Sequence, residues 1–558
     1  MRNSPIIKII CLVSICCLYF NVLFAQAPDA YVVCFTDKNF NFYSVDKPEY
    51  FLSSRAIAKR QRYHIPICEE DLPINPTYIS AITKFQAVKL LTKSKWMNHI
   101  VIQCDDENVL AIITLFPFVD QVRKIHELDV SRFFTESEDQ PTVFDSQQRE
   151  PYQDTVSLDS YGVATRQMNV HNGHILHNYG FKGEGMLVVV LDNGYRDLDK
   201  LSCFQSFRAN NRLKGMYDAA QQPTYDPYQT GGHGTFVLSI MAIEEPYVFI
   251  GTAPRADYVL IRTEMTNYED LLEEYFWVAG AEYADSIGAD VVNASLGYAY
   301  FDKPEQEHSF MHLDGKHSVA SIAAGILARK ACIPCIAAGN EGNKPWHYIT
   351  IPSDAPDALC VAAMGTDSII AEFSSRGSIL FPTIKPDVTS IGSKTIFCAP
   401  IDSLVEGNGT SLASPIIAGL CACLWQAFPE KTNKEIMDAI RQSAHLAHKP
   451  DSLFGYGIPD FKAAFNMLSQ TSIYTPNNEN GITLYPNPSN TYINVHYDTP
   501  NQNEKIVQIY DIYGKILKEI RFSNNTLSIA LSDLKSGMYM LRIKEDNIRV
   551  RNSKFIKN

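Results

Sequence analysis

The apolar run Met186-Leu-Val-Val-Val-Leu191 ends at the turn signal Asp192-Asn-Gly194. A short, valine-rich run of this kind predicts a strand that is buried on both faces. Further apolar runs alternate with helical patterns along the chain: the runs Asp290–Val292 and Ile333–Ala338, and the helices Asp270–Ile287 and Ser411–Phe428. For residues 155–470, this alternation predicts an α/β fold with a mainly parallel sheet flanked by helices.

A smaller domain precedes this central domain. Residues 26–150 hold strand-like pieces at Tyr31–Phe35 and Ile100–Gln103 and an amphipathic stretch at Tyr78–Leu91, which predict a small α+β domain. The domain ends in the polar tract Thr135–Asp154, which we expect to be an exposed, protease-accessible linker.

A third domain follows the polar linker Thr475–Asn480. Residues 480–558 consist of short alternating runs, split by turn signals, at Tyr492–Tyr497, Ile506–Tyr510 and Met538–Ile543. Short alternating strands of this kind predict a small antiparallel β-sandwich.

The N-terminal segment, residues 1–25, has the layout of a secretory signal peptide. Arg2 and Lys8 precede the apolar run Ile9–Phe24, and the small residue Ala25 follows it, so we expect export and cleavage after Ala25. A membrane anchor is the alternative, because about 20 apolar residues are long enough to span a bilayer.

Composition narrows the function classes. Hydrophobic residues make up 46% and charged residues 20% of the 558 residues, which is typical of globular proteins. The net charge of −13 argues against nucleic-acid binding, because the chain has no basic surplus to displace counterions from phosphates.

The cysteines are scattered, which argues against a dense disulfide framework. Cys332 and Cys335 form a C-x-x-C pair, a pattern found in redox and metal sites, but they lie in a predicted buried strand. We therefore predict buried free thiols there, and also at Cys421 and Cys423 in a helical stretch. Seven cysteines lie in the stretch from Cys203 to Cys423, both included, so at least one of them is free unless it pairs between chains.

Two glycine-flanked motifs carry a nucleophile and a base. Ser411 lies in Gly409-Thr-Ser-Leu-Ala-Ser-Pro415 and opens a predicted helix, and His233 lies in Gly231-Gly-His-Gly-Thr235 and opens another. A serine hydroxyl needs a neighbouring base to accept its proton during attack, and histidine is the usual base. Taken singly, each motif also fits an ordinary structure: a helix N-cap for the first and a flexible glycine loop for the second.

Asp192 supplies the third group of a catalytic triad. It ends a predicted parallel strand, the position at which α/β sheets place their sites, and a carboxylate there can orient a histidine through its Nδ1–H. The alternative is a plain Asp-Asn-Gly turn. The order Asp192, His233, Ser411, with spacings of 41 (192 to 233) and 178 (233 to 411) residues, is more specific than any one motif.

On these motifs the chain resembles the subtilisin-like (subtilase) family of serine peptidases, in which the triad follows this order. The resemblance implies that Asp192, His233 and Ser411 are catalytic, and that Asn340, in Ala337-Ala-Gly-Asn-Glu-Gly342, donates to the oxyanion. It also implies that Ser295, Leu296 and Gly297 pair with an extended substrate backbone.

The chain departs from the family pattern in a few places. Asn193 stands where Ser or Thr usually follows the aspartate, and Leu412 replaces the commoner Met. Asn193 can in principle donate its side-chain amide to the carboxylate. No cofactor is expected. Calcium often stabilises relatives, but the sequence has no compact acidic cluster to name as a calcium site, and we predict no metal ligands.

The flanking domains carry resemblances of their own. Residues 26–150 resemble the inhibitory, chaperoning prosegments of secreted subtilases, and the alternative is a permanent accessory domain. Leu484-Tyr-Pro-Asn-Pro488 and Ile509-Tyr-Asp-Ile-Tyr-Gly514 resemble the sorting domain of the type IX secretion system, and the alternative is an adhesion or glycan-binding sandwich. The resemblance implies export through the periplasm to the surface or medium, with the outer-membrane secretion machinery as partner.

The leading hypothesis is thus a secreted serine endopeptidase that acts on proteins or peptides through an acyl-enzyme. A non-catalytic binding protein that retains the fold is one alternative, but it has no need of a complete triad together with Asn340. An esterase or transferase with the same nucleophile is another, and the predicted peptide-pairing strand favours protein substrates over it.

Overall fold

The computed structural model describes most of the chain. It covers residues 29–125 and 159–557, except for 221–225, 227, 266–268, 379–380, 382, 472–481, 486–488, 490, 498–504, 512–514, 525, 536 and 546–548. The predicted signal peptide at residues 1–25, the tract Thr135–Asp154 and the linker Thr475–Asn480 lie outside the described residues.

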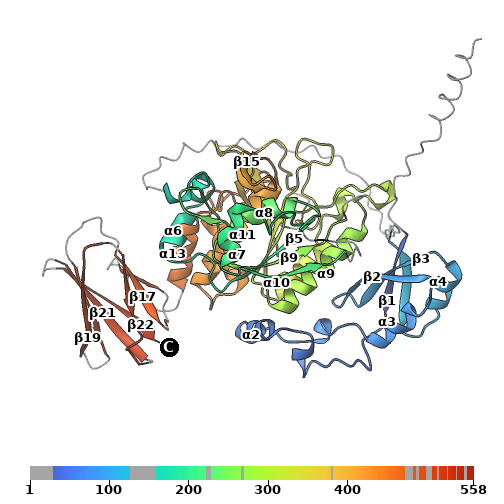
Figure 1. The fold of residues 1–558 in the computed structure, drawn as a ribbon, viewed down its shortest axis with the longest axis horizontal. Helices are drawn as coiled ribbons and strands as arrows, with labels where there is room; N and C mark the ends of the chain where they lie inside the picture. The colour runs from blue at the N-terminus through green and yellow to red at the C-terminus, as the bar shows by residue number, and fades with distance from the viewer. Residues whose placement is uncertain are drawn as a thin grey trace, which may run out of the picture.

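A seven-stranded parallel sheet forms the centre of the molecule, in the order β13-β12-β11-β10-β5-β9-β6 (Figure 1). Its strands are β5 (Leu187–Asp192), β6 (Leu213–Asp218), β9 (Asp257–Arg262), β10 (Val291–Ala294), β11 (Ile333–Ala337), β12 (Leu359–Met364) and β13 (Val388–Ile391). The predicted α/β fold with a mainly parallel sheet is therefore confirmed.

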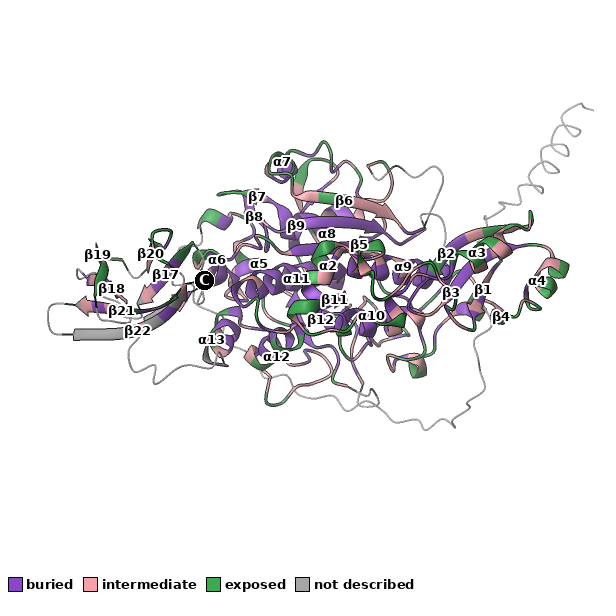
Figure 2. Ribbon diagram, turned by 90° about the horizontal axis from the view of Figure 1, so that it is seen from below, coloured by how far each residue is buried: buried purple, intermediate pink, exposed green. Residues whose placement is uncertain are grey.

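Alternate residues of β5 face opposite layers of helices, because side chains along a strand point in opposite directions. Val188 and Val190 pack in one apolar cluster with α8 (His233–Ala242) and α11 (Thr410–Ala427). Val189 and Leu191 pack in another with α9 (Leu272–Ile287) and α10 (Val319–Arg329). The continuous valine run thus reflects burial on both faces, which Figure 2 shows as buried residues along the central strands and α11.

α11 is the one helix among the described residues that is long and apolar enough to cross a membrane, but 89% of that stretch is buried inside the protein. It is the core helix of the central domain. The remaining elements of that domain are α5 (Thr165–Asn169), α6 (Gly173–Asn178), α7 (Gln205–Ala209), α12 (Asn433–Ser443), α13 (Phe461–Thr471), β7 (Glu244–Glu245), β8 (Phe249–Ile250), β14 (Thr395–Ala399) and β15 (Ser403–Gly407), with short 3-10 turns that include η4 (Ser202–Phe204).

The N-terminal domain is built on a four-stranded antiparallel sheet in the order β2-β3-β1-β4. Its elements are β1 (Ala30–Phe35), α2 (Ser54–Arg62), α3 (Pro76–Thr83), β2 (Val88–Ser94), β3 (His99–Cys104), α4 (Glu107–Ile113) and β4 (Val119–Lys124). The amphipathic stretch Tyr78–Leu91 is not one element, because it is divided between α3 and β2. Leu90 lies in β2 and pairs with Ile102 of β3, so cross-strand pairing, a long-range effect, ends the helical pattern.

The C-terminal domain consists of two antiparallel sheets, as predicted, with strand orders β16-β17-β20 and β19-β18-β21-β22. The strands are β16 (Ile482–Tyr485), β17 (Tyr492–Tyr497), β18 (Lys505–Tyr510), β19 (Ile516–Phe522), β20 (Thr526–Ala530), β21 (Gly537–Glu545) and β22 (Arg549–Lys557). The Tyr485 ring packs against Phe465 of α13, with ring centroids 6.0 Å apart, and so joins this domain to the central one.

One disulfide, between Cys203 of η4 and Cys398 of β14, connects residues 195 apart in the chain. The scattered spacing of the cysteines offered no way to identify this pair in the sequence. The prediction of buried free thiols is confirmed at Cys332, Cys335, Cys421 and Cys423.

Candidate active site

Asp192 and His233 meet at the carboxyl end of the central sheet. Asp192 is the last residue of β5 and is fully buried, and His233 is the first residue of α8. His233 Nδ1 lies 2.9 Å from Asp192 Oδ1 and 3.1 Å from Oδ2. The backbone N–H of Asn193 also donates to Asp192 Oδ1, at 2.8 Å, so the carboxylate is held from two sides.

Glycines allow the loops that carry these two residues to interlock. Gly231 has φ +59°, and a Cβ there would lie 2.4 Å from the carbonyl oxygen of Asn193. A Cβ on Gly194 would lie 2.0 Å from the carbonyl oxygen of Thr230. Because glycine has no side chain at either position, the histidine loop can lie directly on the turn after the aspartate.

Asp192 raises the pKa of His233. Burial alone would lower the pKa of His233, but the charge of Asp192 and its hydrogen bond outweigh burial and raise the pKa above its ordinary value. The His233 side chain is still 29% exposed, so a ligand can reach its other ring nitrogen. A base with an accessible nitrogen and a raised pKa is suited to accept a proton and return it.

Ser411 occupies the first turn of α11, where backbone N–H groups have no partner within the helix. A Cβ on Gly409 would lie 2.8 Å from Ser411 Oγ and 3.8 Å from Asn340 Nδ2. Gly409 therefore leaves space beside the hydroxyl that any other residue would fill. Both Ser411 Oγ and the Asn340 amide nitrogen border this space.

Thr410 fixes the orientation of Asn340. The backbone N–H of Thr410 donates to Asn340 Oδ1 at 2.9 Å, and its hydroxyl donates to the same oxygen at 3.1 Å. Since the amide oxygen is engaged in this way, the NH₂ group is turned toward the Ser411 side. An amide NH₂ and backbone N–H groups at a helix N-terminus are the groups that stabilise a developing oxyanion.

The segment Ser295, Leu296 and Gly297 continues beyond the end of β10, alongside the nucleophile. The Ser295 hydroxyl donates to the backbone oxygen of Ser411 at 2.8 Å. Gly297 is exposed, so its backbone is accessible. A side chain would not fit there, because a Cβ would lie 2.1 Å from Thr350 Oγ1.

The structure thus brings the predicted residues to one edge of the sheet. Within the described part of the chain, however, no hydrogen bond joins His233 to Ser411. Catalytic hydrogen bonds are often long before substrate binds, so the arrangement still fits a triad whose last contact tightens in the complex.

The chain also matches known protein families, in three successive stretches. The subtilase family matches residues 183–457, between a Bacteroidota peptidase S8 propeptide domain at 30–141 and a secretion system C-terminal sorting domain at 483–558. The central domain, residues 183–457, belongs to the subtilase family. The chain is a serine peptidase homologue with a propeptide, and its sorting domain indicates a secreted or cell-surface protein.

Two curated subtilases illustrate the similarity. Subtilisin E of Bacillus subtilis is 28% identical over 294 residues, which are 52% of this chain and 68% of that protein. Subtilisin of Bacillus pumilus is 28% identical over 293 residues, 52% of this chain and 94% of that protein. Among solved structures, one titled "Crystal structure of MycP1 with the N-terminal propeptide removed" aligns with a TM-score of 0.42 and 18% identity, covering 56% of this chain and 98% of that one.

Compared with the sequence-based expectation for a subtilase, the structure corrects the contact at Asn193. Its backbone N–H donates to Asp192; among the described residues, no bond joins its side-chain amide to that carboxylate, and Asn193 Oδ1 is buried without a hydrogen-bond partner. Because every residue except proline carries a backbone N–H, this contact does not require Ser or Thr at that position.

Supporting residues of the subtilase site were missed in the sequence. Besides Thr410, these are Ser414, whose hydroxyl donates to Asn293 Oδ1 at 2.8 Å, and Asn293, whose Nδ2 donates to Ser295 Oγ at 3.0 Å. These buried bonds connect the nucleophile helix to the segment that precedes Gly297. Polar residues at positions with a buried pattern were the signal that could have revealed them.

The structure also contains an acidic cluster that the sequence analysis did not find. Carboxylate oxygens of Glu264, Glu269 and Glu273 lie within 4.8 Å of one another. Burial raises the pKa of Glu264 to about 8 and, together with neighbouring carboxylates, that of Glu273 to about 11, which favours protonated carboxyls. A second group of potential metal ligands consists of Cys203, Cys398 and Asp402, but both of its sulfurs are bonded to each other in the disulfide. We assign no calcium site.

Proposed function

We propose that this subtilase is a secreted serine endopeptidase that hydrolyses peptide bonds through Asp192, His233 and Ser411. The observation that carries the proposal is the buried Asp192 carboxylate on His233 Nδ1, at the same sheet edge as Ser411 and the Asn340 amide. In the proposed reaction, Ser411 Oγ attacks the scissile carbonyl while His233 Nε2 accepts its proton. His233 then gives that proton to the leaving amine, and water hydrolyses the acyl-enzyme by the reverse transfers.

Binding of an extended peptide would use the backbone of Ser295, Leu296 and Gly297. The chain leaves the sheet after Ala294, so backbone groups beyond it can pair with a substrate strand. Side-chain hydrogen bonds tie Ser295 to the nucleophile helix, and this would hold the scissile bond at a constant distance from Ser411. Protein and peptide substrates are therefore favoured over small esters.

The experiment is a digestion assay with an unstructured protein such as casein, using purified protein in which every sample, Ser411→Ala included, has been processed in trans by tagged parent enzyme that is then removed. Ser411→Ala should abolish hydrolysis. The matched control Ser403→Ala, at an exposed position in β15, should retain it. Full activity of the Ser411→Ala protein would overturn the proposal.

We further propose that residues 26–150 are a removable inhibitory prosegment, and that the C-terminal domain directs type IX secretion through the periplasm. Ser411→Ala should then leave the precursor uncut, and normal maturation of that variant would rule out autoprocessing. Deletion of 480–558 should retain the protein in the periplasm, whereas undisturbed release would contradict a sorting role.

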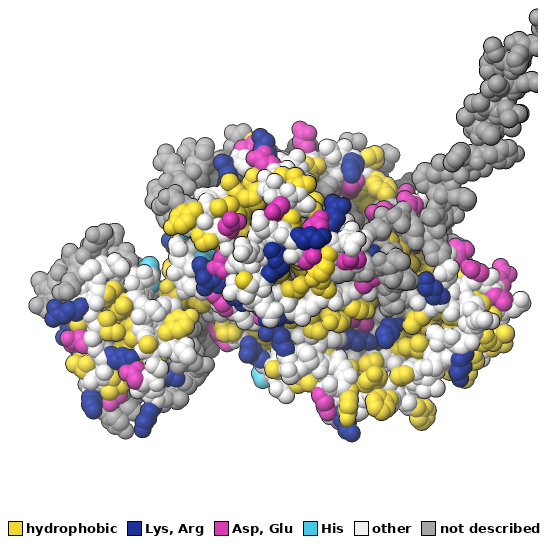
Figure 3. Space-filling model, viewed as in Figure 1, with side chains coloured by type: hydrophobic (Ala, Val, Ile, Leu, Met, Phe, Trp, Pro, Cys, Tyr) yellow, Lys and Arg dark blue, Asp and Glu magenta, His cyan; other side chains and the backbone are white. Residues whose placement is uncertain are grey.

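On the face seen in Figure 3, basic and acidic side chains of the described residues are interspersed. This mixed distribution of charge agrees with our proposal that nucleic acid is not a partner.

A further inference from the structure

The N-terminal domain contacts the central domain in two regions. One is its four-stranded sheet, where Arg123 of β4 donates to the Tyr275 hydroxyl of α9 at 3.1 Å and the β2–β3 hairpin contacts the same helix. Ser94 donates its hydroxyl to Glu282 of α9 at 2.6 Å, and the backbone N–H groups of Lys95 and Trp96 donate to the same carboxylate at 2.9 and 3.0 Å. The other is the long connection between β1 and α3, residues 38–75, which carries α2 under the central domain and away from the sheet (Figures 1 and 2). We call residues 38–75 the strap.

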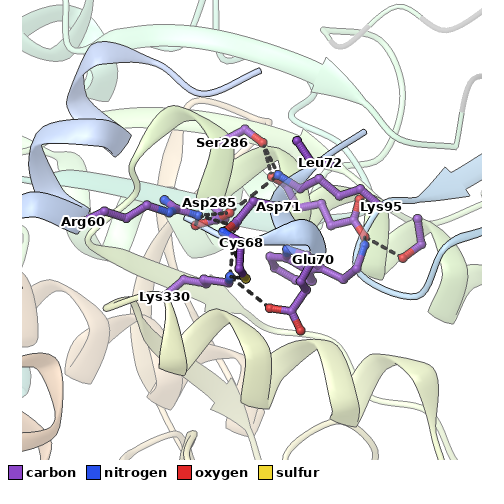
Figure 4. Close-up of polar contacts among 12 residues, drawn as sticks. Arg60, Cys68, Glu70, Asp71, Leu72, Lys95, Asp285, Ser286 and Lys330 are labelled. Carbon is purple, nitrogen blue, oxygen red and sulfur yellow. Dashed lines mark hydrogen bonds and ion pairs between the residues drawn. The ribbon is translucent and has the colours of Figure 1, made fainter. Parts of the chain in front are cut away.

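The strap makes a buried ion-pair network with the central domain (Figure 4). Arg60 Nη2 lies 2.9 Å from Asp71 of the strap and 2.8 Å from Asp285 at the end of α9. Lys330, which follows α10, lies 2.9 Å from both Glu70 and Asp71. Arg60 and Asp285 are each at most 4% exposed. Within the described residues, the ion pairs of Asp285 and Lys330 are all made with the N-terminal domain.

The end of α9 explains why cations are needed there. A helix C-terminus carries partial negative charge, yet the last turns of α9 hold Glu282 and Asp285 and no basic residue. The strap supplies the missing charge. Lys59 donates to the carbonyl oxygen of Ala289, just beyond the helix, and Arg55 donates to that of Gly288 at 3.0 Å and to Asp290.

The fit is also steric. Gly288 ends α9 with φ +81°, and a Cβ there would lie 2.7 Å from the backbone nitrogen of Ala56 in α2. At the other end of α2, the Tyr63 ring lies 5.8 Å from that of Trp425, and its hydroxyl donates to Pro429 O at 2.9 Å. The strap therefore rests on the ends of α9, α10 and α11 through both charge and shape.

We propose that the strap is a second docking site, separate from the four-stranded sheet, that keeps the prosegment bound to the peptidase after the connection between them has been cut. This inference rests on the proposed removal of the prosegment. Two attached sites on one body raise the effective concentration of each for its receptor, so release requires both to open or the strap to be cut. Once the whole prosegment leaves, Asp285 loses Arg60 and Lys95, and Lys330 loses Glu70 and Asp71, which makes the bound state the favoured one.

The test measures prosegment retention without catalysis. A cleavage sequence for a site-specific protease is placed in the tract 135–154 of the full-length Ser411→Ala chain, and the cut protein is followed by size-exclusion chromatography and by its dissociation rate on dilution. The cut parent should elute as one complex. Arg60→Gln should dissociate at least about 30-fold faster, because one partner of a buried charge pair is lost. The matched control Arg62→Gln, exposed on the same helix, should behave as the parent.

Equal dissociation of the Arg60→Gln and Arg62→Gln proteins, or immediate separation of the cut parent, would overturn the proposal. If Arg60→Gln does not yield folded protein, Arg55→Gln decides in its place, because the Arg55 side chain is 42% exposed at the edge of the network. That variant should also dissociate faster than Arg62→Gln, and equal rates would count against the strap. Every sample carries Ser411→Ala, so the outcome does not depend on whether the enzyme hydrolyses peptides.

Discussion

His233 Nδ1 lies 2.9 Å from Oδ1 of Asp192, whose side chain has no exposed surface. A buried carboxylate in this position fixes the tautomer of the histidine and leaves its Nε2 as the nitrogen that accepts a proton. The proposed chemistry of this subtilase depends on that pair.

The first prediction concerns the carboxylate. Asp192→Asn should lower kcat by about 10⁴-fold, because the amide favours the wrong tautomer and no longer stabilises the imidazolium. The fold should be unaffected, as judged by circular dichroism. Asp199→Asn, a change at an exposed position in the same loop, should leave kcat unchanged. Comparable activity of the Asp192→Asn and Asp199→Asn proteins would contradict the assigned role.

The second prediction concerns pH. The base must be neutral to accept a proton, and Asp192 holds the pKa of His233 above its ordinary value of 6.5 despite burial. The acid limb of kcat/KM should therefore fall at a pH above 6.5. The acid limb of the residual activity of the Asp192→Asn protein should lie at lower pH, because the group that raises the pKa of His233 is gone. Initial rates from pH 5 to 10 measure this, and a limb below pH 6.5 in the parent would disagree with the geometry.

The third prediction concerns the oxyanion. Asn340→Ala should lower kcat by about 10²–10³-fold with little change in KM, because its NH₂ acts on charge that develops only in the transition state. Asn343→Ala, at an exposed position three residues away, is the control. A loss confined to KM would indicate instead that Asn340 binds substrate in the ground state.

The fourth prediction concerns the disulfide. Cys203 and Cys398 close a loop of 195 residues, so Cys203→Ser should lower the free energy of unfolding by about 2–4 kcal/mol. Measured in the full-length chain, which retains the N-terminal domain, Cys68→Ser removes an exposed free thiol and should have little effect. Denaturant unfolding of the two variants makes the comparison, and equal midpoints would show that the bond does not stabilise the fold.

Local patterns in the sequence were sufficient for the central fold. The β5 strand and the α9 and α11 helices begin and end within two residues of their predicted bounds, because burial on both faces leaves a clear apolar run. The amphipathic pattern at Tyr78–Leu91 did not reveal its division between α3 and β2, because Leu90 pairs with Ile102, a contact that no local pattern shows.

The site residues also divide into those that a local motif marks and those that only tertiary contacts bring together. Asp192, His233 and Ser411 stand in short motifs at strand and helix ends, so the sequence could indicate them. The partners of Asp285 and Lys330 could not be predicted, because they lie 190 or more residues earlier in the chain (285 − 95 for Lys95) and meet only through tertiary packing. The Cys203–Cys398 pair was out of reach for the same reason.

The activated serine can be probed by covalent labelling with a fluorophosphonate and peptide mass spectrometry, with parent and variant both processed in trans by tagged parent enzyme that is then removed. Attack on phosphorus requires a serine activated by its base. We expect a single adduct on Ser411 in the parent and its loss in His233→Ala. An adduct on a different residue, or labelling of Ser411 that persists without His233, would contradict it.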